Sequence, residues 1–132
     1  MIIGIGIDII EVSRIERLIH LYGKHFLHRI FTEDERKYCS SKHNSSVHYS
    51  GRFAGKESVS KALGTGLSKN IRWKDIEIIS EKSGQPYVKI YGNARKILQN
   101  FGEVKIHISI SHTRKHASAI TIIEDLTNTR RN

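Results

Sequence analysis

Two stretches near opposite ends of the 132-residue chain alternate strictly between branched aliphatic and small or polar side chains. Isoleucine occupies positions 3, 5, 7 and 9, and isoleucine or valine occupies positions 104, 106, 108 and 110. A period of two is typical of a strand that buries one face. We therefore predict a strand at each stretch, with the isoleucines of the first on its buried face.

The other face of the first strand carries Gly4, Gly6 and Asp8. Glycine weakens a strand interior and often marks a position where a ligand or another backbone comes close. A carboxylate beside two positions without side chains therefore indicates an approachable site around Asp8.

The rest of the chain predicts helices and a hairpin. Capping signatures at Ser13–Glu16 and Thr32–Glu35 indicate two helix starts, with Gly23 ending the first helix. We predict the longest helix at 49–63, strands at 73–79 and 87–91, a helix at 93–101 and a last strand at 117–123. This order indicates an α+β fold, a mainly antiparallel sheet with packed helices, as one domain over 1–125 and a polar tail over 126–132.

Charge and cysteine content indicate the kind of partner and the cellular compartment to expect. Lys and Arg outnumber Asp and Glu by 22 to 13, a formal charge of +9 that favours encounter with polyanions without identifying one. Cys39 has no partner in the chain, and the apolar start lacks a basic leader and is interrupted by Asp8. We expect a cytoplasmic protein without a signal peptide or membrane span.

The segment 52–64 holds the densest group of candidate functional residues. On a helix Glu57 and Lys61 stand four residues apart and face the same way, which is compatible with a site or with an ordinary surface ion pair. Arg52 and Lys56 lie on a different side of that helix, so they need not join the same site.

Four blocks in series resemble the holo-acyl-carrier-protein synthases, the short class of 4'-phosphopantetheinyl transferases, and the similarity runs from Ile3 to about Glu124. Any one block is weak evidence, whereas the ordered set is specific. The blocks are GIGID at 4–8 followed by SRI at 13–15, FTE at 31–33, RFAGKE at 52–57 with KALG at 61–64, and SISHT at 109–113.

The resemblance implies an enzyme of that fold, in which a carrier-protein serine attacks the β-phosphate of coenzyme A and releases adenosine 3',5'-bisphosphate. It implies Asp8 and Glu57 as ligands of Mg²⁺ and Lys61 as a phosphate contact, and these three residues are the catalytic candidates. The chemistry agrees, because Mg²⁺ is commonly held by one or two carboxylates together with phosphate oxygens.

The resemblance also implies partners and an assembly. It predicts an acidic acyl carrier protein as substrate in fatty acid biosynthesis, and a homotrimer with sites shared between subunits. Two departures from the family pattern are Gln85, where a basic residue is frequent, and His116, where an aromatic residue is common. The implied coenzyme A residues are Arg52, Lys61, Gly84, Pro86, His112 and Thr113, and the carrier-binding residues are Arg14 and Arg17.

Other functions fit the residues less well. His107, His112 and His116 lack a zinc-ligand spacing, and we expect His107 to be a strand histidine with a polar partner. Adjacent strand residues face opposite ways, which argues against Ser111 and His112 as nucleophile and base. A small nucleic-acid binder or a basic adaptor for acidic proteins would also carry +9, but neither needs two carboxylates at a basic site.

Overall fold

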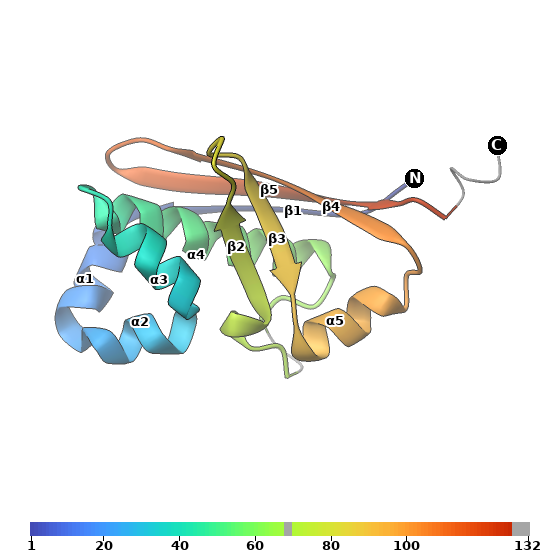
Figure 1. Ribbon diagram of the computed structural model, residues 1–132, viewed down its shortest axis with the longest axis horizontal. Helices are drawn as coiled ribbons and strands as arrows, with labels where there is room; N and C mark the ends of the chain where they lie inside the picture. The colour runs from blue at the N-terminus through green and yellow to red at the C-terminus, as the bar shows by residue number, and fades with distance from the viewer. Residues whose placement is uncertain (68–69, 128–132) are drawn as a thin grey trace.

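Helix α4 runs along one face of a three-stranded antiparallel sheet, and a separate two-stranded hairpin crosses in front of it (Figure 1). The computed structural model describes residues 1–67 and 70–127, so positions 128–132 of the predicted tail lie outside the described residues. The elements are β1 (Ile2–Glu11), α1 (Val12–Tyr22), α2 (Lys24–Ile30), α3 (Glu33–Ser40), α4 (Ser45–Ala62), the 3-10 turn η1 (Trp73–Asp75), β2 (Ile76–Ser80), β3 (Pro86–Ile90), α5 (Gly92–Gln99), β4 (Val104–His112) and β5 (His116–Asp125).

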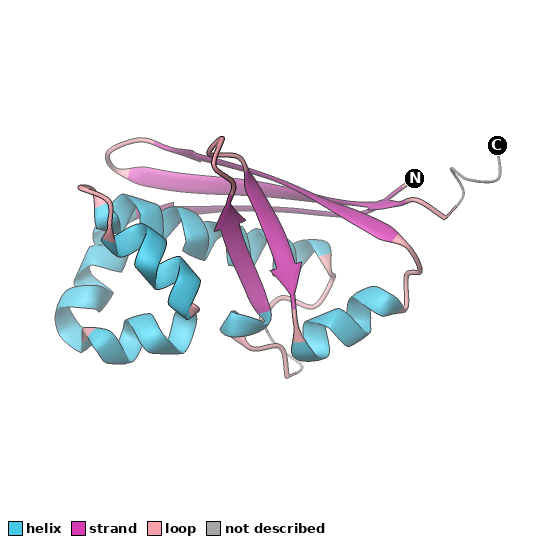
Figure 2. Cartoon of the chain, in the orientation of Figure 1, coloured by secondary structure: helices cyan, strands magenta, loops and turns pink. Residues whose placement is uncertain are grey.

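The sheet joins the two ends of the chain. Its strand order is β1-β5-β4, with both pairings antiparallel, and β2 pairs with β3 in the hairpin. Figure 2 shows the helices gathered on one side of the long sheet. The predicted α+β fold with mainly antiparallel pairing is confirmed.

The predicted burial of the first strand is wrong for three of its four isoleucines, whereas Ile3 is partly buried against the core. Ile5, Ile7 and Ile9 are 63%, 66% and 69% exposed, and their face of β1 points away from the helices. The inner face is the one that carries Gly4 and Gly6. The period of two was right, but periodicity alone does not say which face meets the core.

Contact between β1 and α4 explains the inversion. A Cβ atom added at Gly4 would lie 2.1 Å from the carbonyl oxygen of Ala62, and one added at Gly6 would lie 2.0 Å from that of Ser58. Strand and helix backbones therefore touch directly, as the glycines suggested. A hydrogen bond of 2.7 Å between the hydroxyls of Ser58 and Thr121 joins α4 to β5 as well.

Helix starts were predicted with mixed success. The capping box of Thr32 and Glu35 is formed, with both reciprocal hydrogen bonds present at 3.3 and 2.8 Å. The box at Ser13–Glu16 is not, because the N-cap of α1 is Glu11, two residues before Ser13, and it makes no side-chain cap hydrogen bond. Gly23 ends α1 with a φ of 53°, a conformation that glycine adopts without strain. Helix α2 follows at once and was not predicted, since its sequence has no capping signal.

A buried ion pair fastens the helices to the hairpin. Lys56 Nζ lies 2.7 Å from Glu35 Oε1, and both side chains are fully buried. The lysine also donates to the carbonyls of Trp73 and Ile76, and Glu35 Oε2 accepts from the amide of Ile78 at 2.9 Å. Burial lowers the pKa of Lys56, and the neighbouring Glu35 carboxylate opposes that effect. The pair therefore belongs to the interior that joins α3, α4 and β2.

Cys39 is completely buried in the core formed with Phe31, Tyr49 and Ala54. Burial raises the pKa of its thiol to about 12, so the residue serves packing. Within residues 1–67 and 70–127, no helix is both long and apolar enough to cross a membrane.

Candidate functional site

Asp8 and Lys61 meet where β1 lies against α4. Lys61 Nζ is 3.1 Å from Asp8 Oδ1 and also donates to the carbonyl of Ile7 at 3.0 Å. The side chain of Asp8 is 17% exposed and that of Lys61 is 49% exposed, so solvent reaches the pair. Two residues separated by more than fifty positions are thus joined by the direct contact of strand and helix.

Glu57 belongs to the same group of charges. It is half-buried one helical turn before Lys61. Its pKa is raised, first by burial and then by the nearby carboxylate of Asp8, while Lys61 and Arg14 act in the opposite direction. Two carboxylates close enough to raise a pKa, beside a lysine, form a site suited to a cation and a phosphate.

The chemistry of the two carboxylates is compatible with a magnesium ion. In the part of the chain that the structure describes, no three or more His, Cys, Asp or Glu residues gather as a metal cage. Mg²⁺ is commonly bound through one or two carboxylates and completed by water and substrate phosphate. Asp8 and Glu57 match that pattern.

Arg52 lies elsewhere on α4 and faces the hairpin. It is only 5% exposed, donates a hydrogen bond to Ser80 Oγ, and places its guanidinium 4.1 Å from the centre of the Tyr38 ring. Its Nε has no hydrogen-bond partner among the described residues. Arg52 therefore adjoins the hairpin that carries Gly84 and Pro86.

His112 and Thr113 lie at the end of β4, beside the first turn of α4. They line a hollow of about 570 Å³. The ring of His112 packs against that of His48, with 5.8 Å between the ring centres. The remaining lining residues are Glu16, His43, Asn44, Ser45, Ser46, Val47 and Arg114.

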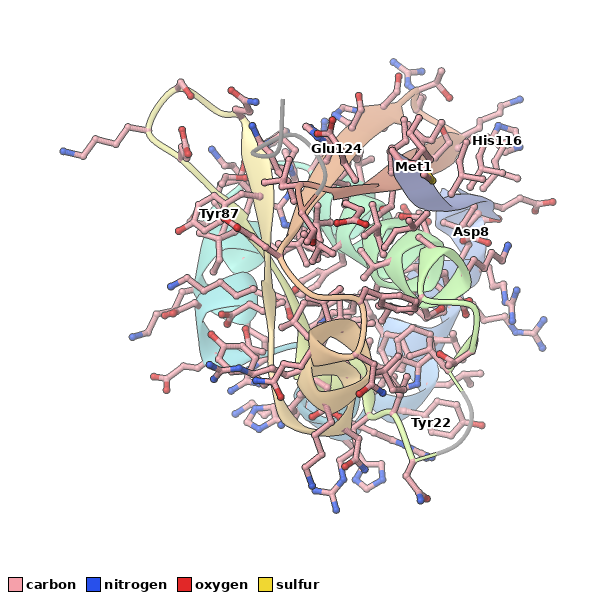
Figure 3. The ribbon with its side chains drawn as sticks, turned by 90° about the vertical axis from the view of Figure 1, so that its right-hand side faces the viewer. Met1, Asp8, Tyr22, Tyr87, His116 and Glu124 are labelled. Atoms are coloured by element: carbon pink, nitrogen blue, oxygen red, sulfur yellow. The ribbon has the colours of Figure 1, made fainter. Side chains whose placement is uncertain are left out.

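The site residues form two groups within one subunit. Asp8 and Lys61 are joined at the contact of β1 and α4, whereas Arg52 and His112 are linked through the rings of Tyr38 and His48. In Figure 3, Asp8 and His116 lie on one side of the molecule and Tyr87 of the hairpin lies on the other. Among the residues that the structure describes, no hydrogen bond, ion pair or ring contact joins the group around Asp8 to the group around His112.

Arg14 and Arg17 are exposed on α1, at the end of β1. They border a hollow of about 650 Å³ that Ile9 and His116 also line. Arg14 interacts electrostatically with the carboxylate group, because its positive charge lowers the pKa of Glu57. The basic surface of α1 therefore adjoins the group around Asp8.

Comparison with known proteins identifies the family of the chain. Residues 4–122 match the 4'-phosphopantetheinyl transferase superfamily. The chain belongs to that superfamily. A holo-[acyl-carrier-protein] synthase of Koribacter versatilis is 43% identical over 125 residues, which are 95% of this chain and 100% of the relative.

Solved structures of superfamily members share the fold. A holo-(acyl-carrier-protein) synthase from Bacillus anthracis in complex with CoA (3',5'-ADP) superposes with a TM-score of 0.78 at 37% identity, covering 95% of this chain and 98% of that one. The holo-[acyl-carrier-protein] synthase from Neisseria meningitidis gives a TM-score of 0.86 at 31% identity, covering 94% and 99%. The resemblance read from the four sequence blocks is confirmed.

Two residues beside the candidate site of this transferase-superfamily chain escaped sequence reasoning. Tyr38 and His48 pack ring to ring, with centres 5.8 Å apart, between Arg52 and His112. They come from different helices, and no motif or spacing joins them. His107 behaves as predicted, since its Nε2 lies 3.0 Å from Glu124 Oε1 on the outer face of the sheet.

Proposed function

We propose that this chain transfers the 4'-phosphopantetheine group of coenzyme A to a serine of an apo acyl carrier protein, giving the holo carrier and adenosine 3',5'-bisphosphate. Family membership and the names of the relatives support the reaction. The observation that carries it is the meeting of Asp8, Glu57 and Lys61 at the contact of β1 and α4.

The two carboxylates would hold Mg²⁺. When bound, the ion supplies positive charge to the diphosphate of coenzyme A, where negative charge develops during transfer. Lys61 contributes a second positive charge and donates hydrogen bonds to Asp8 Oδ1 and to the carbonyl of Ile7. Its ammonium has a third N–H, and solvent access to the side chain would let that donor contact a phosphate oxygen.

The second group would bind the nucleotide end of coenzyme A. The hollow lined by His112 and Thr113 supplies polar groups suited to a phosphorylated nucleoside, and Arg52, which is buried against Tyr38, would add positive charge. The glycine turn at Gly84, with a φ of 91°, and the following Pro86 would bound this region from the hairpin.

The direct test is mass spectrometry of a purified apo carrier protein after incubation with the enzyme, coenzyme A and Mg²⁺. We expect a mass increase of one phosphopantetheine, and none when the metal is chelated. An unmodified carrier after long incubation with active metal and coenzyme A would exclude the proposed reaction. Binding of duplex DNA without any response to coenzyme A would instead favour the alternative hypothesis that the protein binds nucleic acid.

The acidic carrier would dock on α1. Arg14 and Arg17 are exposed there and match the charge of such a partner, and Arg14 reaches the carboxylates electrostatically. A carrier held on this helix would therefore bring its serine close to the phosphate site. The setting would be cytoplasmic fatty acid biosynthesis.

Reversing both charges, Arg14→Glu with Arg17→Glu, is expected to weaken carrier binding about tenfold or more, because like charges would then face each other. Coenzyme A affinity should fall far less, since the group proposed to bind its nucleotide end lies elsewhere. Calorimetric titration of each ligand measures both affinities. The matched control is Arg95→Glu with Lys96→Glu, the same change of charge on the exposed surface of α5. Equal loss of affinity for the carrier and for coenzyme A would contradict separate binding regions for the two partners.

We further propose that the protein is a homotrimer with sites at the subunit interfaces. The outer face of β1 exposes Ile5, Ile7 and Ile9, and the β5 residues Ile120 and Ile122 lie opposite two of them. A continuous apolar surface of this kind on a water-soluble protein indicates an interface. A second copy of the chain is the proposed occupant, because the described contacts within one subunit leave the two groups of site residues unconnected.

Replacing Ile7 with Lys is expected to shift the assembly toward monomer, since a charge would be buried at the centre of that face. Light scattering coupled to gel filtration measures the molar mass, with Leu21→Lys as the control for an exposed apolar residue outside the sheet. A wild-type protein that is monomeric across micromolar concentrations would contradict the trimer.

A further inference from the structure

His112 owes its placement to a ring rather than to a hydrogen bond. Within residues 1–67 and 70–127, no hydrogen bond to its imidazole is found, and the residue is exposed at the end of β4. Its described contact is the ring of His48 on α4, at 5.8 Å between centres and an interplanar angle of 63°. An edge-on ring contact of this kind restricts both rings.

His48 is itself supported from behind. The Tyr38 ring on α3 meets it edge-on at 5.8 Å and 80°, and the face of Tyr38 carries the Arg52 guanidinium at 4.1 Å. Arg52, Tyr38, His48 and His112 therefore form one continuous stack over three elements, in which neighbouring rings meet edge-on. The stack connects Arg52 on α4 with His112 on β4, two residues proposed to bind the nucleotide end of coenzyme A.

The electrostatic setting favours an uncharged ring at position 48. Burial lowers the pKa of His48, and the nearby charges of Arg52, His112 and Lys42 lower it further. A neutral imidazole in the stack packs against His112 without repelling it. An aromatic hydrocarbon ring should therefore replace it, whereas an aliphatic side chain of similar size should not.

We propose that His48 is a positioning residue, which holds the imidazole of His112 at the mouth of the hollow through ring contact and does not itself touch the ligand. This inference rests on the proposed function for the identity of the ligand, coenzyme A. The position of His112 in the free protein depends on neither ligand nor turnover.

The experiment compares His48→Leu, which keeps apolar volume without a ring, with His48→Phe, which keeps the ring. The exposed His28→Ala on α2 is the control for loss of an imidazole. We expect His48→Leu to raise the KM for coenzyme A about two- to tenfold, with a smaller change in kcat, as the worth of one ring pair implies. His48→Phe should stay within about twofold of wild type. Thermal melting checks that each variant is folded.

A second measurement needs no substrate. In NMR spectra of the free protein, nuclear Overhauser contacts between the His112 ring and the residues lining the hollow should weaken in His48→Leu and return in His48→Phe, a readout that the loss of a neighbouring ring current alone would not move. Unchanged contacts in His48→Leu, or a Phe variant as impaired as the Leu variant, would overturn the inference. If the wild type transferred no phosphopantetheine, the proposed function would fail while the NMR comparison still decided the role of His48.

Discussion

Replacing Glu57 with Gln is expected to slow phosphopantetheine transfer by about a hundredfold or more, and Asp8→Asn should do the same. Each change keeps the shape of the side chain and removes one of the two negative charges proposed to hold Mg²⁺. Loss of a group that stabilises developing charge typically costs about a hundred- to a thousandfold in rate. Initial rates of carrier modification at saturating coenzyme A, followed by mass spectrometry, measure the loss.

The control for these carboxylates is Glu33→Gln, which removes an exposed acid on α3 that pairs only with the surface residue Lys37. It should transfer at the wild-type rate. Circular dichroism should report native helix content for all three variants. Normal turnover in Glu57→Gln would remove that residue from the metal site, and normal turnover in both site variants would remove the metal site altogether.

Replacing Lys56 with Met is expected to lower the free energy of unfolding by about 3–5 kcal/mol, because it leaves the Glu35 carboxylate buried without its cation. Both partners are fully buried at 2.7 Å, so no solvent is near to compensate. Urea denaturation at fixed protein concentration measures the loss, since assembly also contributes to stability.

A surface pair on α3, the helix that carries Glu35, provides the comparison. Lys37 and Glu33 lie 3.3 Å apart, each 73% exposed, and Lys37→Met should cost less than about 1 kcal/mol. Adding Glu35→Gln to Lys56→Met should recover part of the stability, because the stranded charge is removed. If Lys56→Met were no more destabilising than Lys37→Met, the buried pair would have no special structural role.

The sequence predicted the strands and most helices because periodicity and capping are local properties. It was wrong about the buried face of β1, where Ile5, Ile7 and Ile9 suggested a core. Which face is inside depends on what packs against it, and here the close approach of α4 excludes any side chain at Gly4 and Gly6. That contact is a tertiary property, which alternation alone does not contain.

The candidate site shows a similar division. Asp8, Glu57 and Lys61 were proposed from motifs, and the fold brings them together. By contrast, Tyr38 and His48 approach each other only because α3 and the start of α4 pack side by side. Nothing in their separation along the chain indicates a shared stack.

The backbone contact at Gly6 also limits how the carboxylates can change. Asp8 and Glu57 extend from a strand and a helix whose main chains abut, so their spacing is set without intervening side chains that could change conformation. A methyl group at position 6 would push β1 and α4 apart and increase the distance between the two carboxylates. Under the proposed function, folding of the chain therefore sets the positions of the two ion-binding carboxylates before any cofactor binds.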